Sequence, residues 1–436
     1  MKHTSGTFLR ICLCFTPLIA FVILFTFTAQ RAFAADRQQS EAQVGQEQTL
    51  LVHFAADSTQ EMRAAVVAGM GGEVVTWMDQ INVAEVRLPE DAVVAASMTG
   101  GIVTAVEADE RVVSATYTPG DPDFGDKTMS YGFKQIDALS AWDVVTGSQE
   151  IIIAVIDSGV KLDHPEFVGR LVPGYDYINR DSEADDDSGH GTHVAGILAA
   201  GLDNGEGVAG VCPNCRLMPV KVLNEDNLGS WSQLAQGILF AVDHGARIIN
   251  LSLGASTPSG TLASAVDYAL ESGVVVIAAA GNYASDAPFY PAALEGVIAV
   301  GATTSKNTRW SKSDFGEYID LTAPGELIYS TYHNLNNIYH GYTYMSGTSM
   351  ATPFVSGVAG LILSVAPELS ADDVTQALIL GTDDLGVAGR DDDFGNGRVN
   401  AMGALQSPVP GLVEAMGEIT HPDQELVMFL PVLGNN

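Results

Sequence analysis

Short apolar runs alternate with longer segments of helical composition through the last two thirds of the chain. The runs occupy residues 151–156, 217–223, 247–253, 274–279 and 297–302. Runs that are apolar almost throughout are typical of strands buried on both faces, and a helix between two such strands lets them lie parallel. We therefore predict an α/β domain with a doubly wound, mostly parallel sheet and helices on both faces.

Two of the predicted helices are apolar on nearly every side. They cover residues 190–200 and 349–364 and are rich in Gly, Ala, Ser and Val. A helix without a polar face belongs in the centre of a domain. Each of the two begins at a chemically reactive side chain, so a functional site is expected where these helices start.

A separate, smaller pattern precedes this domain between residues 49 and 116. Predicted strands at residues 50–54, 73–77, 81–88 and 103–107 and predicted helices at residues 59–68 and 92–98 follow one another in the order β-α-β-β-α-β. That order is typical of a ferredoxin-like α+β domain. Residues 117–130 are rich in turn formers without periodicity, and we predict a linker there.

The first 34 residues have the parts of a secretory signal peptide. Basic residues without any acid accompany an apolar run at residues 11–27, and Ala32-Phe33-Ala34 fits cleavage after Ala34. An uncleaved membrane anchor is the alternative, because the apolar run is nearly long enough to span a bilayer. We expect cleavage and export, and no stable membrane anchor afterwards.

The charge of the chain narrows the class of partner. The 436 residues carry 20 Lys and Arg against 53 Asp and Glu, a formal net charge of −33. Such a chain repels a phosphate backbone, so nucleic-acid binding is disfavoured. The proline-broken segment at residues 407–410 begins a predicted C-terminal tail, residues 407–436, which is a candidate for attachment to the cell surface.

Two cysteines, Cys212 and Cys215, lie outside the signal segment. Cys-Pro-Asn-Cys is half of a zinc site, but no second Cys or His pair follows at a suitable spacing. In an oxidising compartment a small disulfide loop is the first interpretation, and a free or redox-active pair is the alternative.

Three segments carry side chains that are suited to nucleophilic catalysis. Asp157 ends an apolar strand, His190 lies between two glycines at the start of a buried helix, and Ser349 begins the other buried helix. Alone, each has an ordinary structural explanation: a turn cap, a core histidine and a helix N-cap. His193, one turn after His190, is expected to be a core histidine, and a zinc pair is disfavoured because no acidic residue lies between them.

The three segments together change this interpretation. The motifs Asp157-Ser-Gly, His190-Gly-Thr-His and Gly347-Thr-Ser-Met-Ala-Thr-Pro353, in this order on an α/β frame, resemble those of the subtilisin-like serine proteases, the subtilases. The resemblance extends from about residue 130 to residue 406 and is strongest to the thermitase branch.

The resemblance implies a catalytic role for each motif. Ser349 would be the nucleophile, His190 its general base and then acid, and Asp157 the group that orients the imidazole. Asn282, in Ala-Ala-Ala-Gly-Asn, matches the asparagine of the family's oxyanion hole. Two segments would form the walls of the P1 pocket and pair with an extended peptide, from which we expect broad specificity with a preference for medium or large apolar P1 residues. These segments are Ser252-Leu253-Gly254 and Ala279-Ala280-Gly281.

The same resemblance implies structural calcium and no catalytic metal. A loop before His190 offers closely spaced oxygen ligands, as hard cations require. These are Asp176, Asn179, Asp181, Glu183 and Asp185. A second site would use Glu166, where the family commonly has Asp, with Asn204 and backbone carbonyls of residues 202–208. The alternative for both is a solvated acidic loop.

The sequence as a whole predicts a secreted, monomeric endopeptidase that acts on protein and peptide substrates. Residues 35–118 would be an inhibitory propeptide, residues 119–406 the peptidase domain, and the enzyme would process itself. A catalytically inactive, subtilase-like binding module is the alternative from another class, and a serine-carboxyl peptidase is a second. A phosphate-binding α/β protein is disfavoured because no G-x-x-x-x-G-K motif is present.

Overall fold

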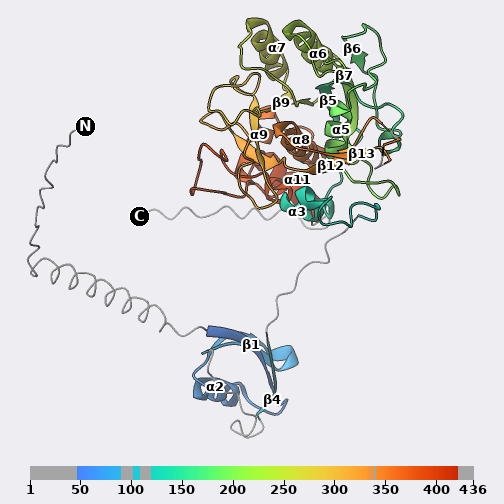
Figure 1. Cartoon of the computed structure of the whole chain (residues 1–436). Helices are drawn as coiled ribbons and strands as arrows, with labels where there is room; N and C mark the ends of the chain where they lie inside the picture. The colour runs from blue at the N-terminus through green and yellow to red at the C-terminus, as the bar shows by residue number, and fades with distance from the viewer. Residues whose placement is uncertain (1–46, 90–101, 109–118, 335, 338–339, 421–436) are drawn as a thin grey trace, which may run out of the picture. The chain divides into compact units, whose positions relative to one another are not determined.

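The computed structural model describes residues 47–89, 102–108, 119–334, 336–337 and 340–420. The chain divides into two compact units, residues 1–114 and residues 115–436, each with its own core (Figure 1). The predicted signal peptide, the predicted helix at residues 92–98 and the last 16 residues of the predicted tail lie outside the described residues.

The smaller unit is a four-stranded antiparallel sheet with one described α-helix. Its elements are β1 (Glu47–Phe54), α2 (Gln60–Gly69), β2 (Glu73–Met78), the 3₁₀ turn Asp79–Ile81, β3 (Val83–Pro89) and β4 (Val103–Ala108). Thr59 caps α2 by accepting a hydrogen bond from the Met62 amide, and Val67 of α2 packs into a core with Val52 and Val86. The strand order β2-β3-β1-β4 is that of the predicted ferredoxin-like arrangement.

The larger unit is built on a seven-stranded sheet in which every pairing is parallel. The strands are β5 (Ile152–Asp157), β6 (Tyr175–Asp176), β7 (Arg216–Lys221), β8 (Ile248–Leu251), β9 (Val275–Ala279), β10 (Ile298–Thr303) and β11 (Leu321–Pro324), in the order β11-β10-β9-β8-β5-β7-β6. The five predicted strands are β5, β7, β8, β9 and β10, so the predicted α/β fold is confirmed. The short strands β6 and β11 were not predicted.

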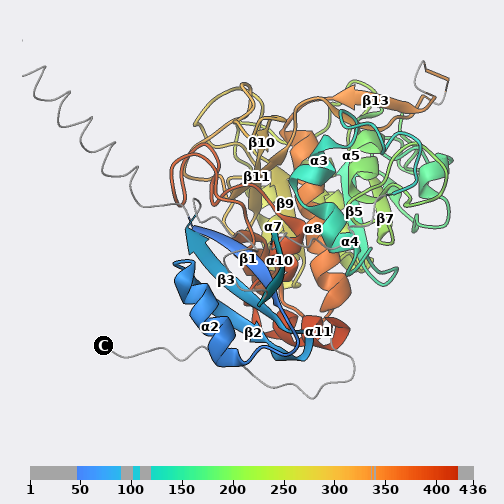
Figure 2. The same cartoon turned by 90° about the horizontal axis from the view of Figure 1, so that it is seen from below.

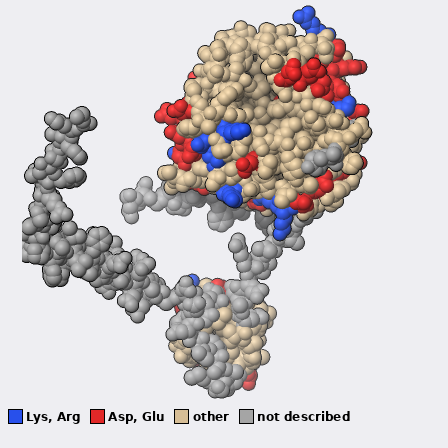
Figure 3. All heavy atoms as spheres, in the orientation of Figure 1, with Lys and Arg blue, Asp and Glu red and all other residues tan. Residues whose placement is uncertain are grey.

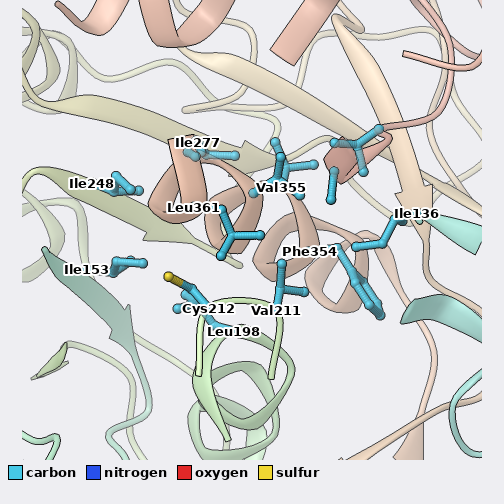
Figure 4. Packing of buried hydrophobic residues seen from close by; sticks show 14 of the residues in the cluster. Ile136, Ile153, Leu198, Val211, Cys212, Ile248, Ile277, Phe354, Val355 and Leu361 are labelled. Carbon is cyan, nitrogen blue, oxygen red and sulfur yellow. The ribbon is translucent and has the colours of Figure 1, made fainter. Parts of the chain in front are cut away.

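Two layers of helices cover the sheet. On one face lie α5 (His190–Ala199) and α8 (Thr348–Val365), packed against Ile153 and Val155 of β5 (Figure 4). On the other face α6 (Trp231–Asp243) and α7 (Gly260–Glu271) pack against Ala154 and Ile156. Neighbouring residues of β5 thus enter opposite cores, which is why the strand is apolar throughout.

The helix α8 runs through the centre of the larger unit, as its all-apolar composition predicted. By length and hydropathy it could cross a membrane, but 83% of it is buried inside the unit. Shorter elements complete the unit around it (Figure 2). They are α3 (Tyr131–Gln135), α4 (Ala138–Trp142), the 3₁₀ turn Pro165–Phe167, the antiparallel pair β12 (Ile328–Thr331) and β13 (Tyr342–Met345), α9 (Ala371–Leu380), α10 (Ala401–Leu405) and α11 (Pro410–Thr420).

Two segments differ from the sequence-based expectation. Residues 119–130, expected as a linker, are packed on the larger unit: Phe124 is buried in the main core, and the buried Asp121 accepts hydrogen bonds from the amides of Asp203 (3.0 Å) and Asn204 (3.1 Å). The described part of the expected tail forms α11, whose Leu412 is fully buried in the same core. Both segments belong to the larger unit because long-range contacts hold them there.

Candidate active site

Asp157 and His190 are joined at the carboxyl edge of the sheet. Asp157 ends β5 and is fully buried, and His190 is the first residue of α5. Nδ1 of His190 lies 2.7 Å from Oδ1 of Asp157, and the Ser158 amide donates to the same oxygen at 2.7 Å. Because the carboxylate can only accept, Nδ1 carries the proton and Nε2 is left as the basic nitrogen.

A second buried carboxylate, Asp186, fixes the start of α5. It accepts hydrogen bonds from the amides of Gly189 (2.9 Å) and Thr192 (2.9 Å) and from Oγ of Ser158 (2.8 Å). A carboxylate that satisfies the free amides of a helix N-terminus is stabilised by the helix dipole. Gly191 must be glycine, since a Cβ there would lie 2.1 Å from the Gly159 carbonyl oxygen.

The surroundings of His190 raise the pKa of its imidazole. Burial favours the neutral ring, but the charge of Asp157 and the hydrogen bond to it outweigh burial, and Asp186 adds to the effect. The pKa of His190 therefore lies above the ordinary value of about 6.5. The arrangement is that of a base whose protonated form is stabilised by two buried carboxylates.

Ser349 is held by a reciprocal pair of hydrogen bonds with Ser252. Oγ of Ser349 donates to the Ser252 carbonyl at 3.0 Å, and Oγ of Ser252 donates to the Ser349 carbonyl at 2.8 Å. The second bond exists because Pro353, inside α8, has no amide hydrogen for the Ser349 carbonyl. Among the hydrogen bonds of the described residues, none joins Ser349 to His190.

Asn282 follows β9 and faces the start of α8. Its Oδ1 accepts hydrogen bonds from the amide (2.8 Å) and the hydroxyl (3.0 Å) of Thr348. With the oxygen committed to Thr348, the Nδ2 group is free to donate to a ligand. Within the described part of the chain, the Ser349 amide also has no hydrogen-bond acceptor, which is usual for the first turn of a helix.

His190, Ser349 and Asn282 line one cleft of 750 Å³, which all but one of the predicted wall residues also line. Of these wall residues, Ser252, Leu253, Gly254, Ala279 and Gly281 line the cleft. Ala280 does not, because its amide donates to the Val300 carbonyl (3.0 Å) and its carbonyl accepts from Tyr318 (2.9 Å). Asp157 lies behind His190 and outside the cleft lining.

The sequence interpretation missed two further parts of the cleft. One is the segment after β7, of which Leu223, Leu228 and Gly229 line the cleft, and the other includes Tyr283 and Phe289. The first could have been found by the argument used for Asp157, since ligands of open α/β sheets bind at the carboxyl ends of the strands.

The residues expected to bind calcium before His190 are engaged within the protein. Asp176 accepts hydrogen bonds from the next turn, including Nδ2 of Asn179 (3.0 Å), and Asp181 accepts from the amide of Glu183 (2.9 Å). Asp185 forms an ion pair with a lysine after β5 (3.1 Å). Among the described residues, no group of three or more His, Cys, Asp or Glu side chains is placed to hold a metal ion.

Glu166, expected in the second calcium set, does not fit that role. Its buried carboxylate already accepts four hydrogen bonds, from the amides of Gly201 (3.0 Å) and Val208 (2.9 Å), Nδ2 of Asn204 (2.8 Å) and the hydroxyl of Tyr342 (3.0 Å). Four neutral donors occupy the lone pairs that a cation would use. Asn204 also points its amino group, not its oxygen, at Glu166.

Cys212 and Cys215 are joined by a disulfide beneath α8. Both sulfur atoms lie close to Gly360 of α8, where a Cβ would be 3.0 Å from each. The disulfide thus belongs to the main core and lies apart from the cleft.

Comparisons with known proteins agree with this geometry. A sequence model of the subtilase family matches residues 148–397. Thermitase from Thermoactinomyces vulgaris is 43% identical over 290 residues, which are 66% of this chain and the whole of that protein. A thermophilic serine proteinase from Bacillus sp. (strain AK1) is 38% identical over 360 residues, 82% of this chain and 86% of that protein.

A solved structure supports the same assignment. The crystal structure of a lanthipeptide protease matches with a TM-score of 0.59 and 27% identity, covering 67% of this chain and 98% of that one. The chain therefore belongs to the subtilase family, and it is a subtilisin-like serine endopeptidase, a hydrolase that cleaves the peptide bonds of proteins.

Proposed function

We propose that Ser349, His190 and Asp157 form the catalytic triad of this endopeptidase and that Asn282 and the Ser349 amide form its oxyanion hole. The observation that carries the proposal is the fixed tautomer of His190: Asp157 accepts a hydrogen bond from the protonated Nδ1, which leaves a basic Nε2 in the cleft that Ser349 lines. A serine hydroxyl needs such a base to attack a carbonyl carbon at neutral pH.

The first half of the reaction forms an acyl-enzyme. Substrate displaces the hydrogen bond between Ser349 and the Ser252 carbonyl, and the Ser349 hydroxyl turns to Nε2 of His190, which takes its proton as Oγ attacks. The oxyanion accepts hydrogen bonds from Nδ2 of Asn282 and from the Ser349 amide. His190 then gives the proton to the leaving amine as the peptide bond breaks.

The second half releases the acid product. Water enters after the amine leaves, His190 takes a proton from it, and the resulting hydroxide attacks the ester carbon of Ser349. Collapse of the tetrahedral intermediate returns the proton to Ser349. Asp157 remains ionised throughout and stabilises the imidazolium, as its short hydrogen bond to Nδ1 allows.

The substrate is an extended peptide that pairs with the residues after β8 and lies against those after β9. Both strands end at the cleft, and the backbone at residues 252–254 offers strand-like hydrogen bonds that do not depend on the substrate's side chains. The backbone groups of Ala280 and Gly281 bond within the protein, so the segment after β9 serves as a wall of the cleft. The described residues that line the cleft include no Asp, Glu, Lys or Arg. An apolar P1 side chain is therefore favoured over a charged one.

The enzyme is made as a secreted preproprotein. The first 34 residues would direct export, and the ferredoxin-like unit would inhibit the peptidase until it is cut away. On the face drawn in Figure 3, the larger unit carries both acidic and basic groups amid uncharged surface and no continuous basic patch, which suits protein substrates and not nucleic acid.

We propose that calcium binds the loop before His190, where it would replace hydrogen bonds that Asp176 and Asp181 accept within the loop. Asp181 and Glu183 have exposed side chains within the same turn region as Asp176, and a bound cation would relieve their mutual repulsion. Asp185 is not among the ligands because a lysine already pairs with it, and Glu166 is excluded by its four hydrogen bonds.

Self-processing tests the proposed function. We expect the full chain, expressed and purified from protease-deficient cells, to convert to a shorter chain, and the Ser349→Ala variant to accumulate uncut. Ser364→Ala is the matched control, because the hydroxyl of this α8 serine donates to the Gly360 carbonyl (2.6 Å), lies 4.0 Å from the sulfur of Cys215, and is outside the cleft. Normal processing of Ser349→Ala in a purified preparation would overturn the proposal.

A further inference from the structure

We propose that Phe289 closes the P1 pocket and restricts this peptidase to peptide bonds that follow a small apolar residue, such as alanine. The inference rests on the proposed function, because it takes the cleft beside Ser349 as the place where substrate binds. It differs from the expectation drawn from the sequence, which was a medium or large apolar P1 residue.

The two walls of the pocket leave a gap because both contain glycine. Gly254 lies after β8 and Gly281 after β9, and these strands are neighbours in the sheet. Neighbouring strands lie about 4.8 Å apart. Because glycine has no Cβ, Gly254 and Gly281 leave space between the two walls. A P1 side chain can enter only if this space is open.

The ring of Phe289 fills this space together with two oxygen atoms, the Tyr290 carbonyl oxygen next to Gly254 and a carboxylate oxygen of Asp314 next to Gly281. A Cβ on Gly254 would lie 2.5 Å from Cε1 and 3.0 Å from Cδ1 of Phe289, and a Cβ on Gly281 would lie 3.1 Å from Cγ of the same ring. One aromatic ring therefore contacts both walls. Phe289 also lines the cleft with 8% of its surface exposed, so it forms the floor against which a P1 side chain ends.

The backbone around Phe289 holds the ring in this position. Tyr290 and Ala255 exchange two hydrogen bonds of 2.9 Å, which ties the residue after Phe289 to the residue after Gly254. On the other side, the buried carboxylate of Asp314 accepts hydrogen bonds from the amides of residues 283 (2.8 Å) and 285 (2.9 Å). The loop that leads from the oxyanion asparagine to Phe289 is thus fixed at both ends.

Packing decides which P1 residues are excluded. Interiors of this density contain little free volume, so a second aromatic ring cannot enter without displacing the first. A methyl group needs only the space above the floor. The pocket therefore discriminates by length, and alanine is favoured over phenylalanine.

Peptide anilides that are identical except at P1 test the inference. The full chain is expressed, allowed to process, and its active concentration is fixed by labelling Ser349 with a fluorophosphonate. We expect the wild type to have a kcat/KM at least about tenfold higher for P1 alanine than for P1 phenylalanine. Phe289→Ala should reverse this order, a change in the ratio of roughly 100-fold.

Controls separate pocket size from other effects of substitution. Phe289→Leu keeps an apolar floor and should give a ratio of kcat/KM values between those of the wild type and Phe289→Ala. This variant also tests the inference if Phe289→Ala does not fold. Tyr268→Ala removes an aromatic ring of α7 whose hydroxyl bonds to Asp243, away from the cleft, and should leave the ratio unchanged.

The outcomes distinguish this inference from the proposed function. If Ser349 is labelled and the alanine substrate is cut, but the wild type prefers phenylalanine or the ratio does not move in either Phe289 variant, the inference about Phe289 is wrong. If Ser349 is not labelled and no substrate is cut, the proposed function fails and this inference fails with it.

Discussion

A buried lysine behind the active site offers a sharp test of how the site is held. Lys221, the last residue of β7, is fully buried, and its ammonium donates to the Ser158 carbonyl (2.6 Å), the Leu223 carbonyl (2.9 Å) and Asp187 (2.6 Å). These acceptors belong to the segment after Asp157, the edge of the cleft and the loop before His190. Lys221→Met removes one charge and three bonds at a similar side-chain length.

The structure sets the size of the effect. Breaking a charge-assisted hydrogen bond to a buried acceptor costs about 1.5–3 kcal/mol. Without the lysine, the Ser158 carbonyl is a buried acceptor that has lost this donor. The side chain of Asp187 is 47% exposed and can accept hydrogen bonds from water instead. Removing the lysine also removes its own desolvation cost, so we expect a net loss of about 2 kcal/mol. For a unit of this size that corresponds to a fall in Tm of roughly 4 °C.

The assay compares two lysines in the Ser349→Ala background, which prevents self-digestion. Tm is measured by scanning calorimetry at one fixed scan rate, because irreversible unfolding makes Tm depend on that rate. Lys161→Met is the matched control: Lys161 forms two ion pairs, with Asp163 (2.8 Å) and Asp185 (3.1 Å), but these partners are largely exposed. It should lower stability by less than about 1 kcal/mol. Equal shifts in the two variants would refute the reasoning.

Three further predictions concern the chemistry of the site. Asn282→Ala should lower kcat by roughly 10²- to 10³-fold with little change in KM, and full kcat in this variant would disprove the oxyanion assignment. Because the pKa of His190 is raised, kcat/KM should fall on acidification with an apparent pKa above about 6.5. Asp186→Asn removes one cause of the raised pKa and should move this acidic fall in kcat/KM to lower pH. An acidic fall at the same pH in this variant would contradict the role of Asp186. A calcium chelator should lower Tm, and Asp181→Ala should show the lower value without chelator, whereas an unchanged Tm in both experiments would exclude calcium at this loop.

Periodic patterns in the sequence predicted the frame of the larger unit. A strand buried on both faces must be apolar throughout, so β5 and its neighbours were visible as runs, and α8 was visible because a central helix has no polar face. The positions of Asp157 and Asn282 followed from the same frame, since both come directly after or at the ends of parallel strands.

Long-range contacts explain what the sequence did not predict. Residues 119–130 have the composition of a linker, but hydrogen bonds from residues more than eighty positions away hold Asp121 in place. The four donors to Glu166 likewise come from two separate segments, the loop at residues 201–208 and β13. The pairing of Ser252 with Ser349 depends on Pro353 inside α8, and no local pattern predicts where a carbonyl left free by proline finds its donor.

Covalent labelling tests the central claim most directly. The processed enzyme is treated with an alkyl fluorophosphonate, and the modified residue is found by peptide mass spectrometry. The proposed mechanism predicts one adduct, on Ser349, whose rate of formation falls on acidification as His190 becomes protonated, because the hydroxyl then lacks its base. An adduct on another serine, or labelling of Ser349 at a rate that does not depend on pH, would contradict it.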